Sequence, residues 1–164
     1  RNPIERTLSN YNYIKQLPER IVNKTGKRQG IISLAKQLSL IELLKTDQQD
    51  VRSVFNNHMT YWLASDWRDE RCNDHLVLDM ALSHLKEFDF VFLTEYFNKS
   101  IELLCKKMDW KIEENFDIQN TSNGHKLSDI SDEAIDLLIS LNNLDLILYE
   151  HAKKKFLDKI SQNQ

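Results

Sequence analysis

The chain opens with Arg1-Asn-Pro-Ile-Glu-Arg6-Thr-Leu-Ser9-Asn-Tyr11, and this stretch carries the signals that begin an amphipathic helix. Asparagine is a favoured N-cap residue and proline fits the first helical position, so Asn2 and Pro3 mark the start. Apolar residues then recur at helical spacing as far as about Leu17, which precedes a proline. The sequence therefore predicts a helix that begins at Pro3.

The same stretch has the composition of an anion site. The guanidinium group of Arg1 forms a fork that matches phosphate oxygens, and the helix N-terminus that follows favours negative charge. Ser9 lies two turns beyond Asn2 on nearly the same face, roughly 10 Å along the helix axis. A phosphate that contacts both Arg1 and Ser9 would lie beside the helix. The alternative is a capped helix with a surface serine.

Helical periodicity continues along most of the chain. Helices are predicted over residues 31–44 (one or two short ones, with Leu34, Leu38, Ile41 and Leu44 on a common face), 74–85, 95–108 and 132–160; residues 19–30 and 113–127 are predicted loops, and 51–62 is ambiguous. One run, Asp89-Phe-Val-Phe-Leu-Thr94, is rich in aromatic and branched residues and is predicted to be a strand. A strand needs partners, so we expect a fragment of an α/β domain with further strands upstream.

Composition sets limits on the class of protein. Hydrophobic residues make up 41% and charged residues 29%, as in globular proteins, and 3 Gly and 2 Pro argue against a turn-rich β fold. The formal net charge of −3 argues against a general nucleic-acid binder but permits a local anion pocket. No apolar run is long enough to span a membrane. Cys72 and Cys105 are too few for a disulfide framework, and they are expected to be buried or inert thiols.

The opening motif resembles the 3′-phosphate-binding motif of sulfotransferases that use 3′-phosphoadenosine 5′-phosphosulfate (PAPS). The family pattern is Arg-[Asp/Asn]-Pro-x-x-Arg-x-x-Ser-x-[Tyr/Phe], and Arg1 and Ser9 stand at the positions that hold the 3′-phosphate. Two later stretches are similar to carbohydrate sulfotransferases of bacterial and Golgi type, namely Phe88-Asp-Phe-Val-Phe-Leu-Thr-Glu95-Tyr-Phe-Asn-Lys-Ser100 and Leu141-Asn-Asn-Leu-Asp145-Leu-Ile-Leu-Tyr149-Glu-His-Ala-Lys153. The resemblance covers nearly the whole chain.

This resemblance implies an α/β fold of the P-loop type with a central parallel sheet. Residues 1–164 would be the C-terminal, mostly helical portion of one sulfotransferase domain. The reaction implied is transfer of a sulfuryl group from PAPS to a hydroxyl, most simply on a carbohydrate, with no metal. The phosphosulfate loop and the general base would precede Arg1, so this chain alone is expected to be inactive, and none of its residues is assigned a catalytic role.

Two further groups of residues are candidates for ligand contacts. The family places a polar loop over the bound nucleotide just before the terminal helix, and Asn120, Thr121, Ser122 and Lys126 occupy that place here. The alternative for these four is a solvated loop. In a separate stretch, Tyr61, Trp62 and Trp67 have side chains that stack on sugars, and packing in the core is the alternative for them.

Other patterns in the sequence indicate less about function. Lys24-Thr-Gly-Lys-Arg-Gln-Gly30 does not match a phosphate loop and is expected to be an exposed basic turn. His58, His75 and His84 lack the spacing of metal ligands and are expected to be core or surface residues. A non-enzymatic helical interaction module is the alternative function. The resemblance places a bacterial protein in the cytoplasm, or a Golgi enzyme in the lumen with an anchor upstream. It implies no nucleic-acid partner, and the oligomeric state is open.

Overall fold

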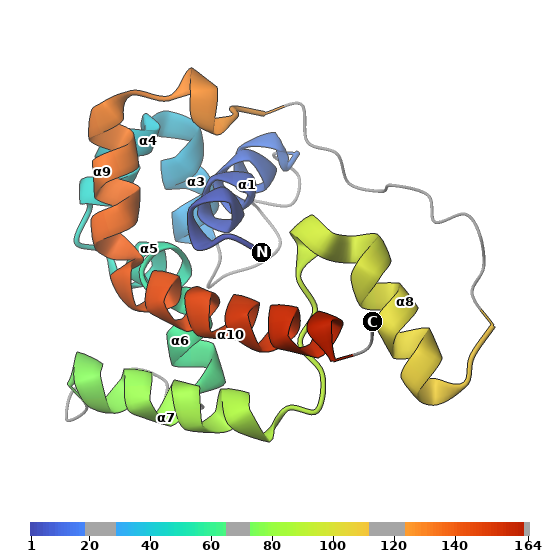
Figure 1. Cartoon of the computed structure of the whole chain (residues 1–164). Helices are drawn as coiled ribbons and strands as arrows, with labels where there is room; N and C mark the ends of the chain where they lie inside the picture. Colours follow the sequence, from blue (N-terminus) through green and yellow to red (C-terminus); the bar gives the residue numbers. More distant parts are fainter. Residues whose placement is uncertain (19–28, 65–72, 112–123, 163–164) are drawn as a thin grey trace. The chain divides into compact units, whose positions relative to one another are not determined.

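The computed structural model describes residues 1–18, 29–64, 73–111 and 124–162, and this part of the chain is mostly helical (Figure 1). Helices hold 78% of the described residues, and none of these residues lies in a β-strand. The chain divides into two compact units. The first unit comprises residues 2–59 and 122–146, and the second comprises Arg1 with residues 60–121 and 147–164.

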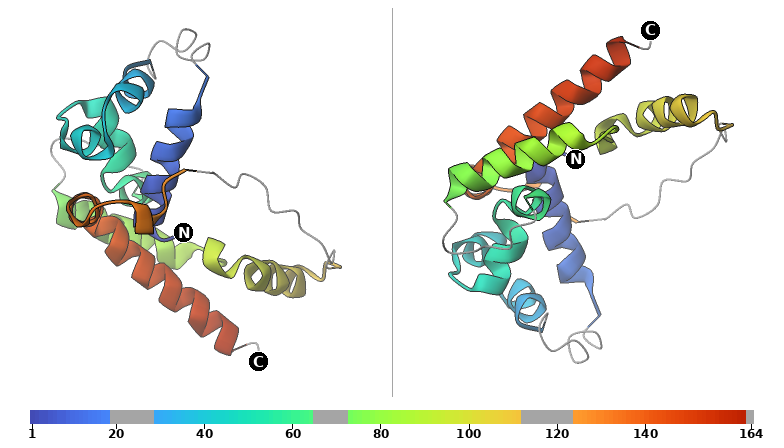
Figure 2. Two further views of the ribbon diagram at one scale, coloured as in Figure 1. Left: turned by 90° about the horizontal axis from the view of Figure 1, so that it is seen from above. Right: turned by 90° about the horizontal axis from the view of Figure 1, so that it is seen from below.

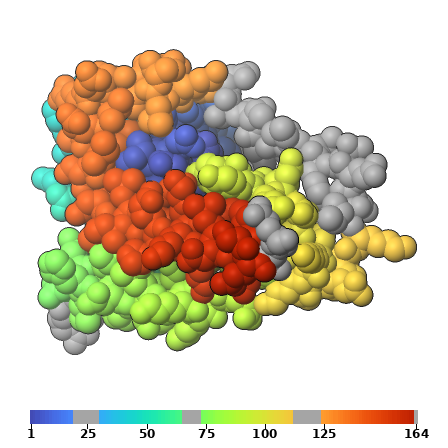
Figure 3. Space-filling model, viewed as in Figure 1, coloured from blue at the N-terminus to red at the C-terminus, as the bar shows by residue number. Residues whose placement is uncertain are grey.

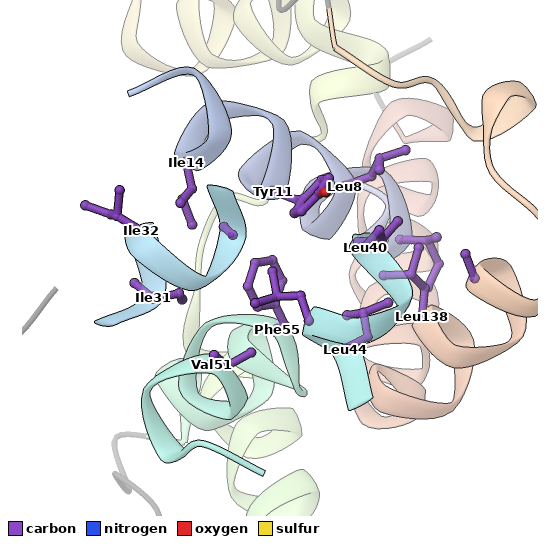
Figure 4. Close-up of a cluster of buried hydrophobic side chains, with 14 residues drawn as sticks. Leu8, Tyr11, Ile14, Ile31, Ile32, Leu40, Leu44, Val51, Phe55 and Leu138 are labelled. Carbon is purple, nitrogen blue, oxygen red and sulfur yellow. The ribbon is translucent and has the colours of Figure 1, made fainter. Parts of the chain in front are cut away.

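The first unit is a helical cluster around one apolar core. Its helices are α1 (Pro3–Gln16), α3 (Gln29–Gln37), α4 (Leu40–Lys45), α5 (Gln49–Phe55) and α9 (Asp132–Leu141), with a short 3₁₀ turn η2 (Leu127–Asp129). Figure 4 shows Tyr11 of α1 and Phe55 of α5 directed into this core, and both side chains are fully buried. The core residues are Ile4, Leu8, Tyr11, Ile14, Ile31, Ile32, Ala35, Leu40, Leu43, Leu44, Val51, Phe55, Ala134 and Leu138. Burial of each large side chain contributes about 1.5–3 kcal/mol.

Helix α1 begins and ends as predicted. The Asn2 Oδ1 atom accepts hydrogen bonds from the backbone N–H groups of Ile4, at 3.0 Å, and Glu5, at 3.3 Å. Pro3 occupies the first helical position and the last helical residue is Gln16. These contacts satisfy backbone donors that have no partner within the helix, so the local sequence is sufficient to fix where the helix starts.

The predicted helical segment 31–44 is two helices, α3 and α4, because Ser39 begins a new helix. The Ser39 Oγ atom accepts from Glu42 N–H at 3.3 Å, and Ser39 N–H donates to Glu42 Oε2 at 2.8 Å, a complete capping box. This break changes the face that packs inward. Leu43 is fully buried, whereas Leu34, Leu38 and Ile41 of the predicted common face are only partly buried.

The second unit contains α7 (Asp74–Glu87), the 3₁₀ turn η1 (Thr94–Tyr96) and α8 (Phe97–Met108), and the predicted helices at 74–85 and 95–108 are confirmed. Two helices begin in the first unit and end in the second. They are α6 (His58–Leu63), which lies in the stretch whose secondary structure the sequence left ambiguous, and α10 (Asn143–Ser161). Figures 2 and 3 show α7 and α10 side by side. Lys155 Nζ donates to the carbonyl oxygens of Leu85, at 2.8 Å, and Lys86, at 2.9 Å. The ammonium group therefore caps the C-terminus of α7.

The strand predicted at Asp89–Thr94 is wrong. These residues lie outside any strand, and Thr94 already belongs to η1. Leu93 is buried: its backbone N–H donates to the Ser100 hydroxyl of α8 at 3.4 Å, and its C=O accepts from Tyr96 N–H at 3.0 Å. The aromatic and branched side chains serve a small core instead of a sheet face: Leu93 packs with Leu103, Tyr149 and Phe156. The central parallel sheet implied by the resemblance is not seen among the described residues.

The single helix predicted over residues 132–160 is interrupted at Asn142. This buried side chain donates from Nδ2 to the Leu138 carbonyl at 2.9 Å and ends α9. The next helix is capped from elsewhere in the chain. Asn57 Oδ1 accepts from the N–H groups of Leu144, at 2.9 Å, and Asp145, at 3.3 Å, while Asp145 Oδ2 accepts from Met59 N–H at 3.0 Å. Asn57 thus caps α10, and Asp145 in return caps α6.

Within the described ranges, no helix combines the length and the apolar character needed to cross a bilayer. Among the same residues, no group of three or more His, Cys, Asp or Glu side chains is placed to hold a metal ion. Cys105 is a buried free thiol, as predicted, and Cys72 lies outside the described residues.

Candidate functional site

The predicted anion residues belong to the opening motif. Arg1 is exposed and precedes the cap at Asn2, and Ser9 is half-buried on α1. Ser9 lies six residues after Pro3, about 9 Å along the helix. Arg1 and Ser9 fall in different units. The helix that carries Ser9 is held by its buried face, through Leu8 and Tyr11.

Asn12, one turn beyond Ser9, clamps a distant segment onto α1. Its Nδ2 donates to the His125 carbonyl at 2.8 Å, and its Oδ1 accepts from His125 N–H at 3.1 Å. A Cβ atom at the neighbouring Gly124 would lie 2.2 Å from Asn12 Cγ, so only glycine permits this approach. The sequence analysis missed this pair. The signals available were a polar residue on the buried side of the helix and one of 3 glycines in the chain.

The clamp holds the end of the predicted nucleotide loop. Lys126 follows directly; its side chain is exposed and its N–H donates to Asp129 Oδ2 at 2.9 Å. This backbone hydrogen bond, with a second from the Ser128 hydroxyl, lowers the pKa of Asp129. The structure therefore places the segment that contains Lys126 against α1, the helix that contains Ser9. The other predicted loop residues, Asn120, Thr121 and Ser122, lie outside the described residues.

Arg6, the second arginine of the motif, lies against a polar junction of α1, α9 and α10. Its Nη2 donates to Thr7 Oγ1 at 3.1 Å, and Thr7 Oγ1 donates to Asn142 Oδ1 at 3.4 Å. The Arg6 Nε atom is buried and has no hydrogen-bond partner among the described residues. Burial lowers the pKa of Arg6, and the nearby Asp145 carboxylate partly opposes this effect. The arginine thus supplies positive charge beside the carboxylate that caps α6.

Tyr149 pairs with Glu95 in the second unit. The Tyr149 hydroxyl donates to Glu95 Oε1 at 3.3 Å. Burial first, and the negative charge of Glu95 second, raise the pKa of Tyr149 to about 12. Tyr149 therefore stays protonated at physiological pH and acts as a hydrogen-bond donor.

A separate pocket of the second unit has a volume of about 550 Å³ and is lined by Trp62, Leu63, His84, Glu87 and Phe88. The last three lie on one face at the end of α7, at positions i, i+3 and i+4. Trp62 is 55% exposed and Phe88 is 50% exposed, so neither is a core residue. His84 Nδ1 lies 2.8 Å from the Leu63 carbonyl oxygen.

Tyr61, the second aromatic candidate, is not among the residues that line this pocket. Tyr61 is half-buried, and its hydroxyl donates to Asp74 Oδ1 at 3.1 Å. Trp67 lies outside the described residues. Of the two described residues that were predicted to contact a sugar or the core, Trp62 is the one that the structure leaves exposed beside polar groups.

Comparison with known families gave one match. The family model described as galactose-3-O-sulfotransferase matches residues 1–163. Searches of curated proteins and of solved structures gave no match. The family match extends over both units of the chain.

Proposed function

This chain belongs to the galactose-3-O-sulfotransferase family, and on that premise we propose that it binds PAPS and takes part in sulfuryl transfer to a carbohydrate hydroxyl. Sulfuryl transfer resembles phosphoryl transfer: the protein holds the donor in line with the acceptor and stabilises the negative charge of the transferred group. Arg1, Ser9 and the loop residues Asn120, Thr121, Ser122 and Lys126 serve the first of these tasks. The proposal includes the central parallel sheet that the resemblance implies, and a cytoplasmic location of the bacterial type.

The opening motif has the chemistry that the 3′-phosphate of the donor requires. Arg1 offers a guanidinium fork beside the N-terminus of α1, and both attract phosphate oxygens. Ser9 offers a hydroxyl donor two turns along the helix. We assign Arg1 the charge-assisted contact to the 3′-phosphate and Ser9 a weaker neutral one.

The clamp between Asn12 and His125 is the observation that carries this proposal. It fixes the segment that begins at Gly124 next to the helix of Ser9, although the two segments are far apart in the sequence. A phosphate site beside α1 and a loop that ends beside α1 can contact the same nucleotide. The proposal therefore includes Asn120, Thr121, Ser122 and Lys126 as contacts to the adenosine or its phosphates.

Nucleotide binding tests the proposal directly. Adenosine 3′,5′-bisphosphate is titrated into the chain and into its variants by calorimetry. A charge-assisted hydrogen bond contributes roughly 1.5–3 kcal/mol, so Arg1→Ala should weaken binding by about ten- to a hundredfold. A neutral bond contributes about 1 kcal/mol, so Ser9→Ala should weaken binding about fivefold. Arg52→Ala is the matched control, because Arg52 is an exposed arginine that pairs with Asp47.

A second ligand separates a phosphate contact from a structural effect. Adenosine 5′-phosphate lacks the 3′-phosphate, so wild type and Arg1→Ala should bind it equally well. If Arg1→Ala weakens both ligands to the same extent, the assignment of Arg1 is wrong. If the chain binds neither nucleotide, the helical interaction module becomes the better description.

A further inference from the structure

We infer that the pocket formed by the end of α6 and the last turn of α7 binds the pyranose ring of the carbohydrate acceptor, an inference that rests on the proposed function. The comparisons assign no residue to this role. Two exposed aromatic rings, the hydrogen-bonding state of His84 and the charge of the pocket lining support it.

The aromatic rings match one side of a sugar. A pyranose ring carries hydroxyl groups at its rim and C–H groups on its faces, and galactose, with its axial 4-hydroxyl, has one markedly apolar face. The face of an aromatic ring is negative and attracts such polarised C–H groups. Trp62 and Phe88 are 55% and 50% exposed, whereas the core aromatics Tyr11 and Phe55 are 1% and 0% exposed.

His84 presents a defined hydrogen-bond acceptor. A carbonyl oxygen can only accept, so the 2.8 Å contact to Leu63 O requires that His84 Nδ1 carries a proton. In the neutral ring, Nε2 is then the acceptor, and this atom makes any hydrogen bond from the ring to a ligand. The contact also caps one of the last carbonyl groups of α6. A sugar hydroxyl is a suitable donor to Nε2.

The lining favours a neutral ligand over a phosphorylated one. Glu87 brings a carboxylate to the pocket, and neither Lys nor Arg is among the described residues that line it. A carboxylate accepts hydrogen bonds from hydroxyl groups but repels phosphate. The volume of about 550 Å³ lies within the range of about 300–1,000 Å³ typical of small-ligand sites. A sugar therefore fits this pocket better than the nucleotide donor does.

Binding of methyl β-galactopyranoside, measured by NMR without any donor, tests the inference. The chain has 3 tryptophans, so the indole N–H signals are few and can be assigned by single Trp→Phe variants. The signal of Trp62 should shift on titration with the sugar, and that of Trp110, which is 56% exposed outside the pocket, should not. Trp62→Ala should weaken binding about three- to tenfold, Trp62→Phe should restore most of it, and Trp110→Ala should have no effect.

Two variants of His84 separate a ligand contact from a structural role. His84→Asn keeps a donor near the position of Nδ1, so the contact to Leu63 can persist, but it lacks an atom at Nε2. This variant should melt like wild type and bind the sugar about fivefold more weakly. His84→Gln, which reaches toward the position of Nε2, should recover part of the affinity.

The possible outcomes distinguish this inference from the proposed function. If the sugar binds but Trp62→Ala and His84→Asn bind it as well as wild type, the acceptor site lies elsewhere and the inference is wrong. Absence of sugar binding overturns it equally. A shift of the Trp62 signal by adenosine 3′,5′-bisphosphate at least as large as the shift by the sugar would assign the pocket to the donor instead. The proposed function is judged separately, by nucleotide binding to wild type and Arg1→Ala.

Discussion

Replacement of Gly124 by alanine should open the clamp that joins α1 to the segment of Lys126. The added Cβ atom would lie 2.2 Å from Asn12 Cγ and 2.6 Å from both Asn12 Nδ2 and Asn12 Cβ, so the amide group of Asn12 must leave its place. Two hydrogen bonds to His125 are then lost, from a side chain that is only 4% exposed. At about 0.5–1.5 kcal/mol for each bond, Gly124→Ala should destabilise the fold by about 1–3 kcal/mol.

Thermal unfolding and amide exchange measure this effect at two levels. A loss of about 2 kcal/mol lowers the Tm of a domain of this size by about 4–8 °C. If the loss is confined to local opening, exchange of the His125 amide should quicken by about thirtyfold, since about 1.4 kcal/mol corresponds to a factor of ten. Donor binding should weaken as well, because the clamp positions the proposed nucleotide loop.

The controls isolate the contact with Asn12. Gly30→Ala is the matched variant. Among the described residues its Cβ would meet only Asp50 Oδ2, at 3.8 Å, and alanine in helix α3 should be neutral or stabilising by about 0.5–1 kcal/mol. In an Asn12→Gly background the three atoms nearest to the new Cβ are absent, so Gly124→Ala should there have a much smaller additional effect. The reasoning is refuted if Gly124→Ala keeps the wild-type Tm and His125 protection, or if its effect is undiminished in that background.

Three further predictions concern caps and ionisation. Asn2→Ala should lower the free energy of unfolding by about 1 kcal/mol, whereas Asn2→Asp should be nearly neutral; urea denaturation measures both. Asn57→Gly keeps the left-handed backbone (φ 44°) but loses the cap of α10, so it should cost about 1–3 kcal/mol in the same assay, and unchanged stability would contradict the reciprocal caps. Since the pKa of Tyr149 is raised from 10 to about 12, its protonated form contributes stability that is present below pH 10 and is lost as the pH rises through about 12; Tyr149→Phe should remove that part of the pH dependence of the unfolding midpoint.

Local signals were enough to predict several elements of the fold. A cap and a first-turn proline specify the start of α1 from adjacent residues, and apolar periodicity predicted α7 and α8 close to their observed bounds. Ser9 could be placed on α1 for the same reason, because the geometry of a helix is known in advance, and the assignment of Arg1 and Ser9 to a phosphate stays a prediction. Elements that depend on interactions between residues close together in the sequence can therefore be predicted from the sequence.

The features that the sequence did not reveal depend on contacts between distant segments. The break at Asn142 is stabilised by Asn57, whose hydrogen bonds span 87 and 88 residues, and periodicity alone continues across it. The segment at Asp89–Thr94 has the composition of a strand, but its Leu93 packs with Tyr149 and Phe156 of α10 in a small core, and composition cannot name such distant partners. The clamp joins Asn12 and His125 across 113 residues, and only close approach in space explains why Gly124 must lack a side chain. The sequence by itself determined the helical elements and the candidate phosphate residues. The tertiary structure decided which distant segments complete each cap, core and candidate site, because those free energies arise only when the segments meet.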